Sequence, residues 1–596
     1  MGIPHLTRHL RPYAVSESLS GREIVIDGPG FAYHVYNICL SGRTEKNQFE
    51  TAISYEQIGV FALAWLNTLR KGKVTIRTIY FDGSLPPSKR EVRIDRLVRN
   101  TKQLLQYHQA HPTPCQILPK KEDHDLRNLF ARSSVRPALK CLPAPPFLVP
   151  AVLEALRASG DFQAVTEVIP GEADEYCAQS VKVNGGVILT GDSDLLLHDL
   201  GAEGAVLFFN DVEVGSNDVP TGQVFHPLKI ADRIGLKAMY DLHSLAFEMT
   251  MNPTLSLPQI LVKSTTFEAV NAYTLKFAQF QRDYVSHTAA PSYRPNDLTT
   301  LEVLRTLDPR ISEFVLQYSS IAKVAGQPQE YTISDAAHIF IPFLLDCPTR
   351  TNSWEMSMGI RQLAYGLVSL IVPKSERKAT IFEHKRQEGK SGGRELSLPE
   401  VPQIQEACSD LVDLLSSKLP SKLLNTADMS QPDIWTAAAI YQDVEWSHYN
   451  SKACVSQLAT QQPTSADPRK LTWDAVHLHA QIQGSHYSFR ILQQITALVT
   501  SRKANYNLPP QLLELQKILQ TLPPLSSIPD ITQAPSLLIK IREHGMLDAA
   551  QTILGIPLPE LRVNKAEKAE KKRKRGKETV TEQVQPTNPY ELLGVE

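Results

Sequence analysis

The chain has 596 residues, 42% of them hydrophobic and 21% charged, which is long enough for two to four globular domains. A formal net charge of −1 provides no overall field that would attract nucleic acid, so any basic contact surface must be local. No apolar run approaches the roughly 18 residues of a membrane helix. The seven cysteines show no Cys-x-x-Cys spacing, which predicts reduced thiols in an intracellular protein and argues against a zinc module.

The first 235 residues alternate between strand-like and helix-like stretches. Helical patterns such as 60–69 and 148–157 lie between short β-branched runs, which are expected to form strands at 23–26, 76–81, 163–169, 187–190 and 205–209. Strands that alternate with helices favour a mainly parallel sheet with helices on both faces. We therefore predict an α/β domain over residues 1–235.

The remainder of the chain has a different texture. Residues 353–372 and 473–499 carry apolar side chains at helical spacing, and proline-rich breaks separate such segments. We predict a mostly helical region over 236–560. Residues 561–596 are polar and charged and are expected to form a disordered tail. Its basic cluster, Lys571 to Lys577, is typical of a nuclear localisation signal or of a nonspecific nucleic-acid contact.

Acidic residues follow four of the predicted strands. In an open parallel sheet, residues just past the carboxyl ends of the strands share one edge, where ligands bind. Gathering like charges there is costly unless a cation neutralises them, and Mg²⁺ prefers oxygen ligands. The pattern therefore predicts a site for one or two Mg²⁺ ions formed by Asp27, Asp82, Glu172, Asp174, Asp192 and Asp194.

Each of these acids also has a simpler explanation when it is considered alone. The Asp82-Gly83 pair is typical of a turn, and the Glu172–Asp174 segment suits the positive end of a helix. The Asp192–Asp194 segment could equally be a solvated loop. The repeated placement directly after strands is what favours a metal site.

A local basic stretch follows Asp82. Residues 89–102 contain six positively and two negatively charged side chains. On a helix, Lys89, Arg93 and Arg96 share one stripe and Arg99 flanks it. A solvated helical face is the ordinary explanation of such a run. Its position next to the predicted metal site instead suggests a surface that grips a phosphate backbone.

Five motifs together resemble a known family. MGIPHLTRHLRPY, GREIVIDGPGFAY, FDGSLPPSK, GEADEYCAQ and TGDSDLLL are similar, in order and spacing, to the motifs of the flap endonuclease and XPG-type structure-specific nucleases, which are PIN-like. The divergent Asteroid branch looks closest, and the resemblance covers about residues 1–230. It implies an XPG-type nuclease core at 1–235 with a helical arch, compatible with a mobile lid, at 90–145. A helical region of the Asteroid type would follow.

The resemblance also implies roles for individual residues. The six acids would hold two Mg²⁺ ions, for which Mn²⁺ could substitute. Lys89 and Arg96, at the family's offsets from the FDG aspartate, would steer the scissile phosphate as catalytic residues. Tyr33 would stack on a terminal base. Gly2 matches a buried N-terminal glycine beside the active site, and Arg93 and Arg99 are further candidate nucleic-acid contacts.

Two departures leave the function open. Met249 stands about where a seventh acid is expected, with Glu248 beside it, and the glycine-rich hairpin that holds duplex DNA in the family is absent. A sliding-clamp motif is also absent.

The first hypothesis is a Mg²⁺-dependent nuclease that cleaves DNA with unpaired 5′ ends or flaps, in DNA repair or replication. The alternatives are an inactive or weakly active adaptor that binds nucleic acid or protein, and an RNA-directed nuclease or post-transcriptional regulator. The basic cluster predicts a nuclear protein, with the cytoplasm as the alternative.

Overall fold

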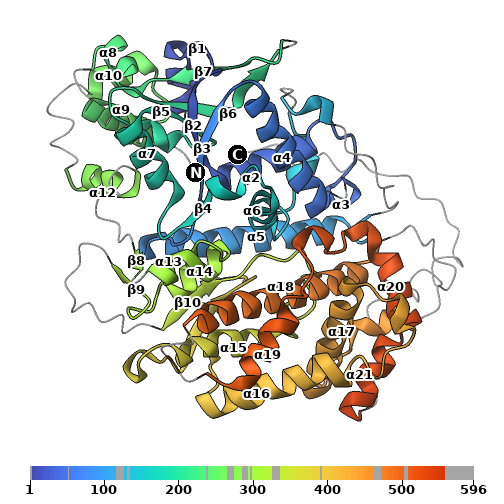
Figure 1. The fold of residues 1–596 in the computed structure, drawn as a ribbon. Coiled ribbons are helices and arrows are strands. Elements are labelled where there is room, and N and C mark those ends of the chain that lie inside the picture. Colours follow the sequence, from blue (N-terminus) through green and yellow to red (C-terminus); the bar gives the residue numbers. More distant parts are fainter. Residues whose placement is uncertain are drawn as a thin grey trace, which may run out of the picture.

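The computed structural model describes most of the chain (Figure 1), namely residues 3, 5–51, 53–115, 126–130, 134–215, 217–236, 239–264, 274–284, 293–295, 298–324, 336–389, 392–460, 471–502, 506 and 508–556. Three predictions fall outside these residues. They concern Gly2, the tail 561–596 with its basic cluster, and the segments 116–125 and 131–133 of the predicted arch.

A seven-stranded sheet forms the centre of the N-terminal part. The strand order is β1-β7-β6-β5-β2-β3-β4, and every neighbouring pair is parallel except β1–β7 and β6–β7. The strands are β1 (Val15–Ser18), β2 (Glu23–Asp27), β3 (Thr75–Asp82), β4 (Thr166–Ile169), β5 (Gly186–Thr190), β6 (Gly204–Val214) and β7 (Pro220–Phe225). The predicted mainly parallel α/β fold is confirmed.

Helices cover both faces of this sheet because side chains alternate along each strand. In β2, Ile24 and Ile26 pack into one hydrophobic cluster, and Val25 packs into another on the opposite face. The first face carries α2 (Gly28–Leu40), α4 (Tyr55–Lys71) and α6 (Leu148–Ala158). The second carries α1 (Leu6–Leu10), α7 (Ala173–Asn184), α8 (Pro227–Arg233), α9 (Met239–Met251) and α10 (Leu257–Ser264). A short helix, α3 (Gln48–Thr51), precedes α4.

The C-terminal part is mostly helical, as predicted. Its helices are α12 (Thr274–Tyr284), α13 (Leu298–Leu304), α14 (Pro309–Val315), α15 (Met358–Leu367), α16 (Val401–Asp413), α17 (Gln431–Tyr449), α18 (Trp473–Ser501), α19 (Pro510–Leu519), α20 (Ala534–Glu543) and α21 (Met546–Leu554). Two small sheets were not predicted. They consist of β8 (Tyr293–Pro295) with β9 (Ala322–Val324), and of β10 (Ala337–Phe340), β11 (Thr380–His384) and β12 (Arg394–Ser397).

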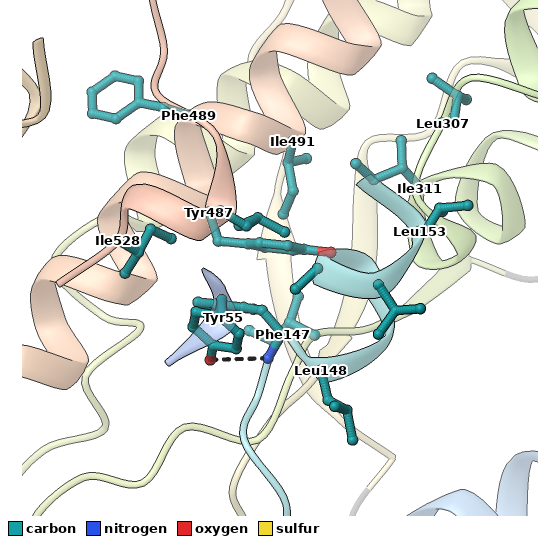
Figure 2. Packing of buried hydrophobic residues seen from close by; sticks show 14 of the residues in the cluster. Tyr55, Phe147, Leu148, Leu153, Leu307, Ile311, Tyr487, Phe489, Ile491 and Ile528 are labelled. Atoms are coloured by element: carbon teal, nitrogen blue, oxygen red, sulfur yellow. Dashed lines mark hydrogen bonds between the residues drawn. The ribbon is translucent and has the colours of Figure 1, made fainter. Parts of the chain in front are cut away.

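The two parts of the chain share one hydrophobic core. Phe147, beside α6, stacks on Tyr487 of α18 with ring centroids 4.5 Å apart and planes 3° apart. Figure 2 shows this contact surrounded by apolar side chains from both parts, including Leu153 and Ile311. The hydroxyl of Tyr55 accepts a hydrogen bond of 3.3 Å from the backbone N–H of Phe147. The predicted boundary near residue 235 is therefore crossed by a continuous packed interior.

Helix α5 (Arg90–Ala110) lies between the two parts (Figure 1). Its buried side chains Leu97, Leu104 and Tyr107 pack in a cluster with Phe343 and Trp473 of the C-terminal part. The indole N–H of Trp473 also donates to the backbone carbonyl of His111, at 2.8 Å. Helix α5, which is the first part of the predicted arch, is thus packed against the C-terminal part.

The remaining expectations concern membranes and thiols. No helix among the described residues is long and apolar enough to span a membrane. All seven cysteines are free thiols.

Candidate active site

Asp27 is the last residue of β2 and the N-cap of α2. One carboxylate oxygen accepts a hydrogen bond from the backbone N–H of Gly30 at 3.0 Å. The other accepts one from the hydroxyl of Thr190 at 2.9 Å. Only 6% of Asp27 is exposed. Burial raises the pKa of its carboxyl group.

Asp82 and Glu172 come from the next strands of the sheet. Asp82 ends β3 and accepts a hydrogen bond from the backbone N–H of Ala173 at 2.8 Å. Glu172 precedes α7 and forms an ion pair with the ammonium group of Lys89. Burial raises the pKa of Asp82 to about 7, and the negative charges of Glu172 and Asp27 act in the same direction.

Asp174 lies at the electrostatic centre of the acids. Its pKa is raised well above the ordinary value by burial, and then by the negative charges of Asp27, Asp192, Asp82 and Glu172. Five acids from four segments of the chain therefore repel one another. The sequence prediction that the strand ends bring them together holds for these five side chains.

Asp192 and Asp194 follow β5, where Asp192 caps the short 3₁₀ helix Ser193–Leu197. Asp194 accepts a hydrogen bond from the backbone N–H of Ile3 at 3.0 Å. Its pKa is raised to about 7 by burial and by the charge of Asp192. Asp194 does not line the cavity that the other five acids share, although its neighbour Ser193 does. Its carboxylate instead holds the N-terminal segment at Ile3.

The five acids line a cavity of about 740 Å³. Its walls are formed by α1, α2 and α5, by the ends of β2 and β3, by the segments that follow β4 and β5, and by residues 208–210 within β6. Lys89, Arg96 and Tyr33 face the acids from these walls. Tyr33 is 53% exposed, which leaves its ring accessible for stacking. Acidic, basic and aromatic groups of the predicted site thus meet around one space.

The two other predicted contacts of α5 differ from Lys89 and Arg96. Arg99 is exposed but does not line the cavity. Arg93 does line it, while its guanidinium group makes a bidentate ion pair with Glu313 of α14, with one N–O distance of 3.0 Å. The same guanidinium lies 3.8 Å from the ring centroid of Phe340.

The position of the missing seventh acid is occupied by core residues. Met249 is 1% exposed and packs in the cluster beneath α9. Glu248 accepts a hydrogen bond from the side chain of Asn252 at 2.9 Å and does not line the cavity. Helices α9 and α10 still form a helical hairpin, joined by residues 252–256, which contain no glycine.

The fit of a divalent cation rests on the chemistry of the donors. Carboxylate oxygens are the ligands that Mg²⁺ and Mn²⁺ prefer. A cation would offset both the burial and the mutual repulsion that raise the pKa values of Asp82 and Asp174. No group of three or more His, Cys, Asp or Glu side chains in the described part of the chain stands in ready-made ligating positions. Mg²⁺ usually keeps several of its waters when it binds a protein, so it can be bound through few direct protein ligands.

Sequence reasoning missed several residues of the site. Thr190 joins two of the acids, because its hydroxyl donates to Asp27 and accepts from the backbone N–H of Asp192, both at 2.9 Å. His34 lines the cavity and stacks on Phe209 at 5.0 Å; burial lowers its pKa to about 4. A threonine at the end of a buried strand was the available signal for Thr190. His34, one residue from Tyr33, had no comparable signal.

The structure is an α/β protein whose mainly parallel sheet carries a carboxylate-lined cavity at its strand ends. Residues 144–398 match the family model described as "XPG domain containing". The chain is also 26% identical over 389 residues to Asteroid homolog 1 of Schizosaccharomyces pombe (strain 972 / ATCC 24843). These matches confirm the resemblance to the XPG and flap endonuclease superfamily and to its Asteroid branch.

The extent of these matches is limited. The alignment with the Asteroid relative covers 63% of this chain and 62% of the relative. Among solved structures, a match with the catalytic core of Rad2 in complex with DNA substrate has a TM-score of 0.25 and 15% identity. It covers 47% of this chain and 77% of that chain.

Proposed function

We propose that the chain is a divalent-metal-dependent nuclease that hydrolyses phosphodiester bonds in DNA with an unpaired 5′ end or flap. The observation that supports this best is the convergence of Asp27, Asp82, Glu172, Asp174 and Asp192 on one cavity whose other walls carry Lys89, Arg96 and Tyr33. Such a reaction needs carboxylates that hold cations and positively charged side chains that attract a phosphate. It also needs an aromatic ring on which a nucleobase can stack.

The five cavity acids are the residues that would hold the metal, whereas Asp194 does not line the cavity. A bound divalent cation activates water and stabilises negative charge on phosphate oxygens. The protein's own cations would orient the substrate: Lys89 is placed next to the acids by its ion pair with Glu172, and Arg96 is exposed on the cavity wall. Tyr33 would hold an unpaired base against its ring.

The decisive experiment compares Asp192→Asn with Asp199→Asn. Both changes remove one negative charge at nearly constant volume, but Asp199 lies outside the cavity and pairs with Lys182 at 2.7 Å. We expect Asp192→Asn to abolish Mg²⁺-dependent cleavage of labelled 5′-flap and single-stranded DNA, and Asp199→Asn to cleave like the wild type. Equal cleavage by wild type and Asp192→Asn would refute the assignment.

A second candidate function is a binding adaptor without turnover. Two observations favour it: Met249 is buried in the core where a seventh acid is expected, and the described residues contain no ready-made three-ligand metal site. An adaptor would bind flap, single-stranded or RNA oligonucleotides without cleaving any of them in Mg²⁺ or Mn²⁺. Assays on matched DNA and RNA substrates therefore separate a DNA nuclease, an RNA nuclease and an adaptor.

In each case we propose a nuclear location, based on the basic cluster at Lys571 to Lys577.

A further inference from the structure

The C-terminal part of the chain contacts Arg93, a residue that lines the cavity. Glu313 of α14 holds both terminal nitrogens of the Arg93 guanidinium. The side chains of Arg93 and Glu313 are each 15% exposed. A bidentate ion pair with so little exposure fixes orientation as well as charge. The contact joins residues that are 220 positions apart in the sequence.

The ring of Phe340 completes this contact. It lies under the Arg93 guanidinium at 3.8 Å and stacks on the imidazole of His384, with centroids 4.0 Å apart and planes at 5°. Arg310 of α14 donates a hydrogen bond to the backbone carbonyl of Phe340. Arg93 therefore has a carboxylate at its terminal nitrogens and an aromatic ring beneath its plane. It cannot turn toward a phosphate without leaving the partly buried carboxylate of Glu313 unpaired.

Helix α14 is itself fixed to the rest of the protein just before Glu313. Arg490 of α18 contacts Asp308 at 3.0 Å, and the backbone N–H of Asp308 donates to the side chain of Gln494 at 2.6 Å. Arg157 of α6 donates to the backbone carbonyl of Thr306 at 2.8 Å. The carboxylate of Glu313, which binds Arg93, therefore belongs to a helix, α14, that is held both by the N-terminal part and by α18.

The ion pair between Arg93 and Glu313 lies between Lys89 and Arg96, the two basic residues of the proposed site. Lys89, the N-cap of α5, is followed at helical spacing by Arg93 and Arg96, and all three residues line the cavity. Fixing Arg93 fixes the turns on either side of it. One of these turns starts at Lys89, which pairs with Glu172, and the other carries Arg96.

We propose that Glu313 is a positioning residue of the nuclease: by holding Arg93 against Phe340 it fixes helix α5, so that Lys89 and Arg96 face the carboxylates. The C-terminal part then completes the active site, and α5 acts as a fixed wall of the cavity. This inference rests on the proposed nuclease function. It gives Arg93 a different role from direct phosphate binding.

The structure offers a closely matched control. Glu154 of α6 pairs with Arg490 of α18 at 2.5 Å and accepts a hydrogen bond from the backbone N–H of Leu525 at 2.7 Å. This ion pair also joins the two parts of the chain, and its side chains are 22% and 12% exposed. It lies outside the catalytic cavity. Arg490 also contacts Asp308 at the start of α14, and that contact is kept in Glu154→Gln. Glu313→Gln and Glu154→Gln therefore weaken similar contacts, only one of which touches α5.

The test uses the full chain and three readouts. Single-turnover cleavage of a labelled 5′-flap DNA and its Kd are measured together with backbone hydrogen exchange in residues 90–96. We expect Glu313→Gln to lower the cleavage rate by about 10²-fold at unchanged Kd, because misplaced catalytic groups cost rate. Exchange at 90–96 should be faster in this variant, whereas Glu154→Gln should match the wild type in rate and in exchange at 90–96.

Arg93→Lys provides a second variant. Lysine keeps the positive charge for a phosphate but cannot form the bidentate pair or the planar stack. We expect Arg93→Lys to behave like Glu313→Gln.

Tighter DNA binding by Glu313→Gln would mean that Glu313 competes with phosphate for Arg93, and would overturn the positioning role. Identical behaviour of Glu313→Gln and Glu154→Gln would also overturn it. If the wild type cleaves nothing, the nuclease proposal fails, and the exchange data alone decide whether Glu313 fixes α5.

Discussion

Thr190 illustrates, at the scale of single residues, how the acids are held. It is the last residue of β5 and is fully buried. Its one hydroxyl connects the carboxylate of Asp27 with the backbone of Asp192, and so joins two strand ends of the sheet. Because an unpaired buried acceptor is costly, this hydroxyl contributes to stability and to the geometry of the acids at once.

The change Thr190→Val tests this double role. It should lower the free energy of unfolding by about 1–3 kcal/mol, because it leaves a buried oxygen of Asp27 without its donor. It should also lower the Mg²⁺-dependent cleavage rate by about tenfold, which corresponds to about 1.4 kcal/mol. Chemical denaturation and single-turnover kinetics measure the two effects.

Thr166→Val is the control for this prediction. Thr166 begins β4 in the same sheet, is 7% exposed and donates to the carbonyl of Phe162 at 2.8 Å. It should lose stability to a similar extent but keep the wild-type cleavage rate. If both variants cleave equally fast, Thr190 supports only the fold.

At the scale of single elements, the β2–α2 junction sets the position of Asp27. The helix begins at once after the strand, and a Cβ on Gly30 would lie 2.2 Å from a carboxylate oxygen of Asp27. The backbone N–H of Gly30 donates the hydrogen bond that Asp27 accepts, so the carboxylate lies directly against this residue. A side chain larger than that of glycine has no space here. A glycine in the first turn of α2 therefore allows the carboxylate of Asp27, at the end of β2, to lie against the helix.

The change Gly30→Ala should displace the Asp27 carboxylate while leaving the fold intact. Alanine favours a helix over glycine by about 1 kcal/mol, which offsets part of the strain. We expect Mn²⁺ affinity, measured by calorimetric titration, to fall about tenfold, or about 1.4 kcal/mol. Gly359, in the first turn of α15, is the control, because a Cβ there meets nothing within 4 Å. Equal Mn²⁺ affinity in Gly30→Ala and Gly359→Ala would count against this geometry.

The elements also show what the sequence can and cannot predict. Strands β2, β3 and β5 were predictable because each is a short β-branched run, and the acids that follow them were predictable with them. The position of α5 was not, because its amphipathic pattern says only that one face is buried and not against what. The partners of Arg93 and Lys89 lie 220 and 83 residues away, and such pairings depend on the tertiary fold.

At the scale of the whole molecule, α18 determines how the two parts depend on each other. This helix of 29 residues is buried on almost every side and carries Tyr487, which stacks on Phe147 of the core. It also contains polar residues that the core must accommodate. His477, His479 and His486 are all buried, and burial lowers the pKa of each.

These histidines make the stability of the molecule depend on pH. Burial lowers the pKa of His486 from 6.5 to about 4, so the folded protein binds this proton less readily than the unfolded chain does. The contribution of neutral His486 is therefore fully present above pH 6.5 and is lost as the pH falls from 6.5 toward 4. Unfolding free energies measured by denaturation between pH 7.5 and pH 4.5 should decrease, by up to about 1.4 kcal/mol per pH unit for each such group.

The variant His486→Gln assigns part of this slope. Glutamine stays neutral over the whole range, so the decrease below pH 6.5 should be smaller by up to about 1.4 kcal/mol per pH unit than in the wild type. His448→Gln serves as the control, because His448 is exposed at the end of α17. If His486→Gln and His448→Gln show the same slope, His486 does not take up the proton on unfolding. Because the core is continuous, acid unfolding that starts at α18 should also remove the support of α14 and α5, and with it the arrangement of the carboxylate-lined cavity.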